Sequence, residues 1–170
     1  MNYIFRKAEK NDADQIWVIL QEAIELRKNE GSTQWQDGYP NLDVIINDIA
    51  KAAGYVLTAQ DAIIGYCMIL VDDEPEYANI RGKWITDTSF VVFHRVAISK
   101  KYLGKGLAQL MLKFVEKIAV EKNIYSIKAD TNFDNFGMLR IFEKLGYIYC
   151  GEVTFRGNSR KAFEKNLQIT

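Results

Sequence analysis

The stretch Phe93-His94-Arg95-Val96-Ala97-Ile98, followed by Lys101-Tyr102-Leu103-Gly104-Lys105-Gly106, decides the fold of this chain. The first run has the pattern of a strand, and the two glycines open an amphipathic helix predicted over 107–122. The first turn of a helix carries unpaired N–H groups and about half a positive charge. Glycines there let the backbone close around an anion, so the stretch predicts a site for a phosphate-bearing ligand.

Around this stretch, strands alternate with helices. The predicted strands are 3–7, 55–59, 62–71, 88–98, 125–129, 147–155 and 160–166. The other helices are predicted to begin at N-caps Asn11 and Asp134 and at Leu42, and glycines end them. Gly65, inside a strand, predicts a bulge or a close backbone approach. These elements predict a mixed α/β (α+β) fold over residues 1–170, one domain whose mostly antiparallel central sheet is flanked by about four helices.

Composition narrows the class of protein. The 22 basic residues balance the 22 acidic ones, so no global field would recruit nucleic acid or an anionic membrane. Apolar runs are of strand length and the first residues lack a signal-peptide pattern, so we expect a cytoplasmic protein. The two cysteines lie far apart and are expected to be buried thiols. One histidine, His94, argues against a metal site.

Three kinds of phosphate loop compete for the glycine turn. A Walker A loop requires Lys-Ser/Thr after its last glycine, and Leu107 excludes it. A dinucleotide fingerprint would use Gly104-x-Gly106 with Asp130 near the ribose, but its third position is Gln109 and the turn lies mid-chain. That hypothesis remains a weaker alternative, as does a tight turn without a ligand.

The third kind is the acyl-CoA site. Lys101-x-x-Gly104-x-Gly106 resembles the Arg/Gln-x-x-Gly-x-Gly/Ala signature of the GNAT superfamily of N-acetyltransferases. Lysine at the first position keeps the charge but loses the guanidinium geometry. Downstream, Asn135-x-x-Met138-x-x-x-Phe142-Glu143-Lys144-Leu145-Gly146-Tyr147 resembles the family's fourth helix, and the predicted order of elements also matches. The resemblance therefore spans essentially the whole chain.

This resemblance implies acetyl-CoA as cosubstrate and no metal. Backbone amides of the turn would wrap the pyrophosphate, the end of the strand would pair with the pantetheine arm, and the fourth helix would cover the thiol end. The implied cofactor-binding residues are Val96, Ala97, Ile98, Lys101, Tyr102, Leu103, Gly104, Lys105, Gly106, Leu107, Ala108, Asn135 and Phe142.

Acetyl transfer to an amine needs a base, a donor to the carbonyl oxygen and an acid for the leaving thiolate. His94 is a candidate base, with a structural histidine as the alternative, and it shares a strand face with Val96 if no bulge intervenes. Many relatives place a tyrosine acid where this chain has Phe142. Tyr147 is therefore our candidate acid, and Tyr149, Asn135 or a water molecule are alternatives.

The resemblance places the acceptor between the first two helices, their loop and the closing hairpin. Trp35, Tyr39 and Arg95 are the predicted substrate-binding residues. Packing of the loop is the alternative for the two rings, and an ion pair with Asp130 or Glu152 is the alternative for Arg95. The acidic run 72–76 is interpreted as a solvated turn, although it would also attract a cationic amine.

Together these features predict an N-acetyltransferase that moves an acetyl group from acetyl-CoA to a primary amine, directly within a ternary complex. The acceptor is a small molecule or a peptide, and a homodimer is left open. The alternative is a non-catalytic acyl-CoA-binding module, because Phe142 has no proton to give.

Overall fold

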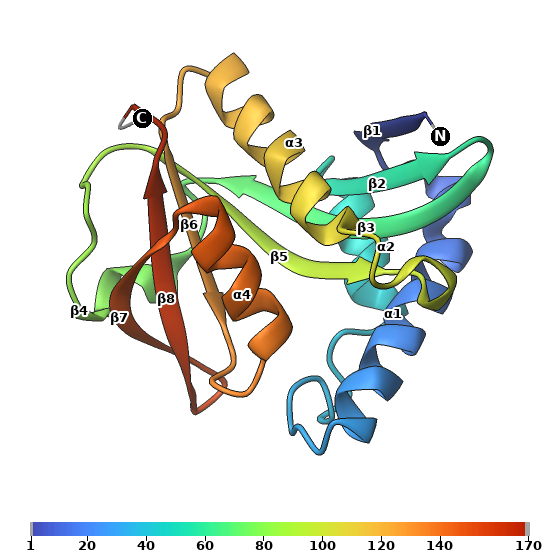
Figure 1. The fold of residues 1–170 in the computed structure, drawn as a ribbon, viewed down its shortest axis with the longest axis horizontal. Coiled ribbons are helices and arrows are strands. Elements are labelled where there is room, and N and C mark those ends of the chain that lie inside the picture. Colours follow the sequence, from blue (N-terminus) through green and yellow to red (C-terminus); the bar gives the residue numbers. More distant parts are fainter. Residues whose placement is uncertain (1, 169–170) are drawn as a thin grey trace. The chain divides into compact units, whose positions relative to one another are not determined.

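The computed structural model describes residues 2–168 as a mixed α/β fold (Figure 1). Within these residues the strands are β1 (Tyr3–Lys7), β2 (Gly54–Ala59), β3 (Ala62–Val71), β4 (Arg81–Gly82), β5 (Phe90–Ile98), β6 (Ser126–Thr131), β7 (Ile148–Phe155) and β8 (Asn158–Asn166). The α-helices are α1 (Ala13–Asn29), α2 (Leu42–Ala50), α3 (Leu107–Glu121) and α4 (Phe136–Leu145). Antiparallel pairs dominate and β5–β6 is parallel, so the predicted fold class is confirmed.

The chain forms two compact units. The first contains the described residues up to Ile69 together with Arg95–Met111. The second contains Leu70–His94 together with the described residues from Leu112 onward. Strands β3 and β5 and helix α3 contribute residues to both units. None of the helices within residues 2–168 has the length and apolar character that a membrane span requires.

In the first unit, β1 pairs with β2 and β2 pairs with β3, both antiparallel. The β2–β3 hairpin turns at Gln60-Asp61, as predicted. Its core packs apolar side chains of the strands against α1 and α2, among them Ile16, Leu20, Ile45, Val56 and Tyr66. The predicted close approach at Gly65 is confirmed, because a Cβ there would lie 2.8 Å from the Met111 sulfur.

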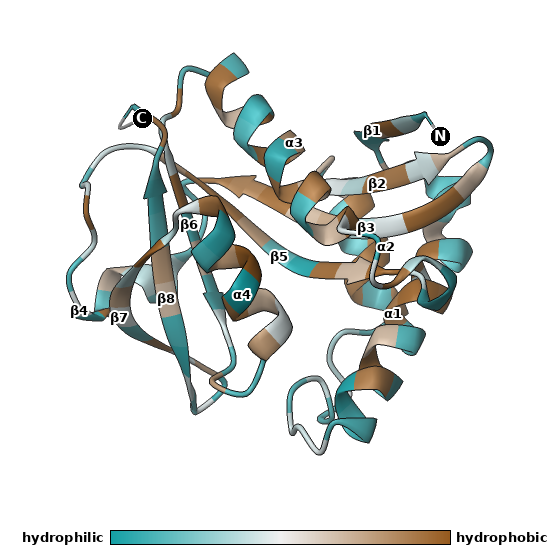
Figure 2. Cartoon of the chain, viewed as in Figure 1, coloured by the Kyte–Doolittle hydropathy of each residue, from teal (hydrophilic) through white to brown (hydrophobic). Residues whose placement is uncertain are grey.

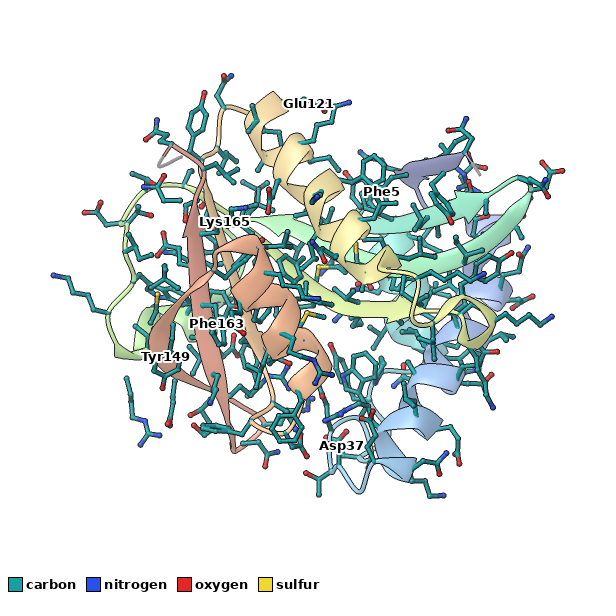
Figure 3. All side chains as sticks on the ribbon, in the orientation of Figure 1. Phe5, Asp37, Glu121, Tyr149, Phe163 and Lys165 are labelled. Carbon is teal, nitrogen blue, oxygen red and sulfur yellow. The ribbon has the colours of Figure 1, made fainter. Side chains whose placement is uncertain are left out.

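In the second unit, β8 lies between β6 and β7, and β7 also pairs with β4. Figure 3 labels Tyr149 and Phe163, which are opposite each other on β7 and β8. Apolar and polar residues alternate along α4 (Figure 2), as expected for a helix that covers a sheet. Its apolar side reaches β8 through Phe142, whose ring centroid is 4.8 Å from that of Phe163.

Two predicted N-caps are wrong, each by one residue. Asn11 lies inside a 3-10 helix (Lys10–Asp12) that precedes α1. The N-cap of α4 is Asn135 rather than Asp134, and its side-chain oxygen accepts a hydrogen bond of 3.2 Å from the Met138 N–H. The predicted end of α4 is confirmed, because Gly146 follows it with a φ of 80°.

Candidate functional site

The glycine turn connects β5 to α3 within the first unit. After a short 3-10 helix, Lys100–Tyr102, the chain turns at Gly104 and Gly106, whose φ angles are 76° and 72°. These angles lie in the left-handed region that favours glycine. A Cβ built on either residue would meet nothing within 4 Å. Backbone shape therefore requires the glycines, and the space beside them is open.

Positive charge surrounds this turn. Lys100, Lys101 and Lys105 are all exposed, and the Lys105 ammonium lies 5.0 Å from the centre of the Tyr102 ring. The first N–H groups of α3 add the partial positive charge of a helix N-terminus. Lysines, open glycines and helix amides form a donor set that fits a pyrophosphate.

Other residues predicted to bind the cofactor lie on β5, in the turn and at the start of α3, whereas Asn135 and Phe142 lie on α4. On β5, Ala97 and Ile98 are buried and Val96 is half-buried. At the start of α3, Leu107 is buried and Ala108 half-buried, whereas Leu103 is exposed.

Strands β5 and β6 separate beside the single histidine of the chain. Their parallel ladder joins Phe90–Val92 to Ser126–Lys128 and ends there, although β6 continues to Thr131. The same register would place His94 opposite Asp130. His94 Nδ1 lies 3.8 Å from Asp130 Oδ2. The ionisable side chains of His94 and Asp130 therefore lie at the position where the β5–β6 ladder would otherwise have continued.

A second carboxylate contacts the other nitrogen of the imidazole. His94 Nε2 is hydrogen-bonded to Glu74 Oε2, and the two side chains are only 14% and 10% exposed. Burial raises the pKa of Glu74, and the hydrogen bond with His94 opposes part of that rise. The acidic run that contains Glu74 is therefore not simply a solvated turn, because this residue turns inward.

Asp130 has its own partners. The Tyr77 hydroxyl donates a hydrogen bond of 2.6 Å to one of its oxygens, and Arg160 Nε donates to the other. Arg160 Nη1 also donates to Asn132 Oδ1, at 2.8 Å. Burial, followed by the nearby Asp130 charge, raises the pKa of Tyr77 well above its ordinary value. The Tyr77 phenol therefore stays protonated and acts as a fixed donor to Asp130.

Arg95 belongs to a buried cluster in the first unit. Its Nε and Nη2 donate to the two oxygens of Asp48, at 3.0 and 2.7 Å, and its Nη1 donates to the Tyr39 hydroxyl. Tyr66 donates a hydrogen bond of 2.6 Å to the same Asp48 carboxylate. The partner predicted for this arginine, Asp130 or Glu152, is therefore wrong.

The backbone of Arg95 is also unusual. Its φ is 57°, a left-handed angle inside a strand, at which a side chain other than glycine costs about 1 kcal/mol or more. This turn of the backbone intervenes between His94 and Val96, so simple strand alternation does not relate their faces. The Arg95–Asp48 contacts are what compensates this strain.

The loop before α2 is fixed to α1. Arg27 donates from Nη2 to Ser32 Oγ at 2.9 Å and from Nε to Gln34 Oε1 at 3.1 Å. Trp35 and Tyr39 follow on this loop and are both half-buried. The Arg95 guanidinium lies over the Tyr39 ring, 5.7 Å from its centroid, so Arg95 holds this part of the loop.

Tyr147, the candidate acid, packs against Phe142. The ring centroids of Phe142 and Tyr147 are 5.2 Å apart, and Phe142 is fully buried. The Tyr147 hydroxyl is buried and has no hydrogen-bond partner among residues 2–168. Burial, with a smaller contribution from Glu116, raises the pKa of Tyr147 well above its ordinary value. A raised pKa makes this phenol a weaker proton donor.

Sequence reasoning missed Glu74 and Asp48, the carboxylates that bind His94 and Arg95. They lie 20 and 47 residues before their partners, and neither belongs to a recognisable motif. The one sequence signal for these carboxylates was that an arginine and a histidine inside a strand need negatively charged partners. Among residues 2–168, no group of three or more His, Cys, Asp or Glu side chains is placed to hold a metal ion.

Comparison with known proteins identifies one family. The sequence model of the acetyltransferase (GNAT) family matches residues 20–147. The chain is 23% identical, over 82% of its length and 78% of the relative's, to YesJ, an uncharacterized N-acetyltransferase of Bacillus subtilis (strain 168).

Solved structures show the same fold. A GNAT-family acetyltransferase from Streptococcus agalactiae 2603 superposes with a TM-score of 0.90 at 36% identity, over 96% of this chain and 95% of the other. A more distant structure, yncA, a putative acetyltransferase from Salmonella typhimurium with its cofactor acetyl-CoA, has a TM-score of 0.69 at 16% identity and covers 99% and 95%.

Proposed function

Because this chain belongs to the acetyltransferase (GNAT) family and is an acetyl-CoA-dependent acyltransferase, we propose that it transfers the acetyl group to a primary amine. The acceptor is a small molecule or a peptide, and the transfer occurs directly in a ternary complex. The observation that carries the proposal is the glycine turn, with open space beside Gly104 and Gly106 and three lysines around it.

Acetyl-CoA, which supplies a thioester that reacts with amines, suits this turn. The amides from Tyr102 to Ala108 would hold the pyrophosphate, and the backbone of Val96–Ile98 would pair with the pantetheine arm. Acetyl-CoA is the cofactor of a structure with the same fold, which supports this assignment. Asn135 and Phe142, which lie at the start and in the last turns of α4, are also proposed to contact the cofactor.

Proton transfer is assigned to His94. As the bond between amine nitrogen and acetyl carbon forms and the carbon–sulfur bond breaks, the amine's proton passes to the imidazole and the leaving thiolate takes up a proton. The amides of 96–98 are proposed to donate to the carbonyl oxygen. Neither cysteine suits a covalent route, because both are buried and burial raises the pKa of Cys67 and of Cys150.

The leaving thiolate also needs a proton donor. Phe142 has no proton to donate, and Tyr147 remains the proposed acid by position alone. Its raised pKa argues against that role, so we expect water to protonate the thiolate if Tyr147 fails.

For the acceptor we propose that the half-buried rings of Trp35 and Tyr39 contact the amine or an apolar part of its molecule. Arg95 contributes to acceptor binding through Tyr39. Its own donors are taken by Asp48 and Tyr39, so it holds the loop instead of binding a substrate carboxylate.

The test is release of free thiol from acetyl-CoA over a panel of primary amines. The variant Gly104→Glu should lose both acetyl-CoA binding and turnover, because it places a carboxylate in the open turn. Gly157→Glu is a matched control, since Gly157 also has a φ of 76° and nothing within 4 Å of its Cβ position. It adds the same charge and the same backbone strain in the β7–β8 turn, and it should bind acetyl-CoA like the wild type.

The second candidate function is a non-catalytic acyl-CoA-binding module, which Phe142 favours. Binding of acetyl-CoA that is sensitive to Gly104→Glu, without turnover of any amine, would establish this alternative. Absence of binding would exclude both functions.

A further inference from the structure

We propose that Glu74 is a positioning residue that fixes His94 as its Nε2–H tautomer, so that Nδ1 is the atom that accepts the proton of the acceptor amine. This inference rests on the proposed function for the reaction itself, but the tautomer is a property of the protein alone. All of the side chains involved lie in the second unit.

The hydrogen bond between Glu74 and His94 assigns the proton. An ionised carboxylate can only accept, so Nε2 must donate to Glu74 Oε2. In a neutral imidazole the second nitrogen then carries the lone pair. Nδ1 is therefore the basic atom of His94.

Asp130 faces that basic atom without engaging it. Its Oδ2 lies 3.8 Å from Nδ1, which is too far for a hydrogen bond. The carboxylate already accepts from Tyr77 and Arg160, which reduce its pull on a proton of His94. When Nδ1 gains the amine's proton, Asp130 is close enough to stabilise the imidazolium.

The groups facing His94 come from four elements. Glu74 and Tyr77 lie on the segment before β4, with Glu76 beside Glu74. Asp130 comes from β6 and Arg160 from β8. The rings of Tyr77 and Phe155 (β7) flank the imidazole at centroid distances of 6.5 and 6.0 Å. Glu74 is the group among them that hydrogen-bonds to the imidazole, so it sets the orientation of the ring.

The segment that carries Glu74 is itself held in place. Tyr77, three residues later, is 2% exposed, donates to Asp130 and packs on Trp84 with ring centroids 4.9 Å apart. The backbone that carries Glu74 is therefore held in one position. A residue that positions His94 needs such an anchor, whereas a residue in a solvated turn does not.

The experiment uses the full chain labelled with ¹⁵N-histidine. Because the chain has one histidine, the imidazole ¹⁵N shifts report His94 without assignment. We expect the wild type to show the Nε2–H tautomer near neutral pH. In Glu74→Ala the fraction of Nδ1–H should rise, because Asp130 becomes the only carboxylate beside the ring.

Turnover is measured in parallel. Glu74→Ala should lower kcat by about 10- to 100-fold, less than the loss of the base itself, and leave the KM for acetyl-CoA unchanged. Glu74→Gln retains a carbonyl oxygen that can accept from Nε2–H, so it should recover part of the activity. Asp73→Ala, which removes an exposed carboxylate from the same segment, is the matched control and should behave like the wild type.

Two results would overturn the inference. One is an Nδ1–H tautomer in the wild type, and the other is a Glu74→Ala variant with the tautomer and kcat of Asp73→Ala. A wild type that shows the expected tautomer but acetylates no amine would instead refute the proposed function. The spectrum also reports whether each variant is folded, so a kcat loss from unfolding is recognised directly.

Discussion

Removing the Arg95 side chain separates a structural role from a substrate-binding one. In Arg95→Ala the Asp48 carboxylate stays in the first unit with Tyr66 as a donor and without its counter-charge. The two side chains of the ion pair are 8% and 5% exposed, so water would not replace the guanidinium. The variant therefore leaves a buried charge unpaired.

The expected cost is large. Removing one partner of a buried ion pair typically destabilises by about 3–5 kcal/mol. Whole domains are stable by only about 5–15 kcal/mol, so this single change should remove a third or more of the stability. Arg95→Lys keeps the charge but loses the two-pronged contact with Asp48, and we expect an intermediate loss.

The assay is urea unfolding of the wild type, both single variants and the double variant Asp48→Ala/Arg95→Ala. Because the second substitution removes the stranded charge, the double variant should be more stable than additivity predicts by about 1–3 kcal/mol. The reasoning fails if Arg95→Ala unfolds at the wild-type urea concentration and only raises the KM for the acceptor. That result would make Arg95 a substrate-binding residue after all.

Three further predictions concern other polar groups. Tyr147→Phe removes a buried hydroxyl without a partner among residues 2–168, so it should stabilise by about 1 kcal/mol and, if water is the acid, retain kcat. Glu164, fully buried, accepts from the backbone N–H groups of 85–86 and from two hydroxyls. Glu164→Ala should therefore lower the free energy of unfolding, measured in urea, by about 3–5 kcal/mol. Glu164→Gln should lower it by about 1 kcal/mol, because the amide oxygen can still accept from the backbone N–H groups and the hydroxyls can rotate to other acceptors. The hydrogen bond from Arg6 holds the pKa of Asp12 below its ordinary 3.8, so Asp12 stabilises the fold above that value and the effect is lost as pH falls through the lower folded pKa. Acid unfolding of Asp12→Asn should accordingly depend less steeply on pH below about 4, and an unchanged profile would contradict this.

Local sequence patterns predicted the elements well where one residue decides the backbone. Gly146 ends α4 in the left-handed conformation, and Gln60-Asp61 turn the β2–β3 hairpin, because both features depend on neighbours in sequence. The prediction of Asp134 as the N-cap was wrong because the chain makes a turn before α4 begins. In this turn the Asn135 N–H donates a hydrogen bond of 3.1 Å to the Asn132 carbonyl oxygen. Such a turn shifts the start of a helix by one residue and leaves no trace in the apolar pattern.

The glycine turn of the candidate site could be predicted for the same reason. From Lys101 to Ala108 the residues are contiguous, and glycine spacing, lysines and the helix start together indicate anion binding before any tertiary contact is known. Arg95 shows the opposite case. Its partners Asp48 and Tyr39 are 47 and 56 residues away, so its role depends on tertiary packing that periodicity does not encode.

The proposed reacting end contains charged groups from three segments that are far apart in the sequence. Glu74, His94 and Asp130 meet only because Tyr77 anchors the first segment to Asp130 and because the β5–β6 ladder stops at Val92. Burying Glu74 raises its pKa, which means that the charged form costs the fold stability at neutral pH. If this residue only served the fold, an amide or an apolar side chain at position 74 would make the fold more stable. An inward-facing acid hydrogen-bonded to His94 is the arrangement that the proposed positioning role requires.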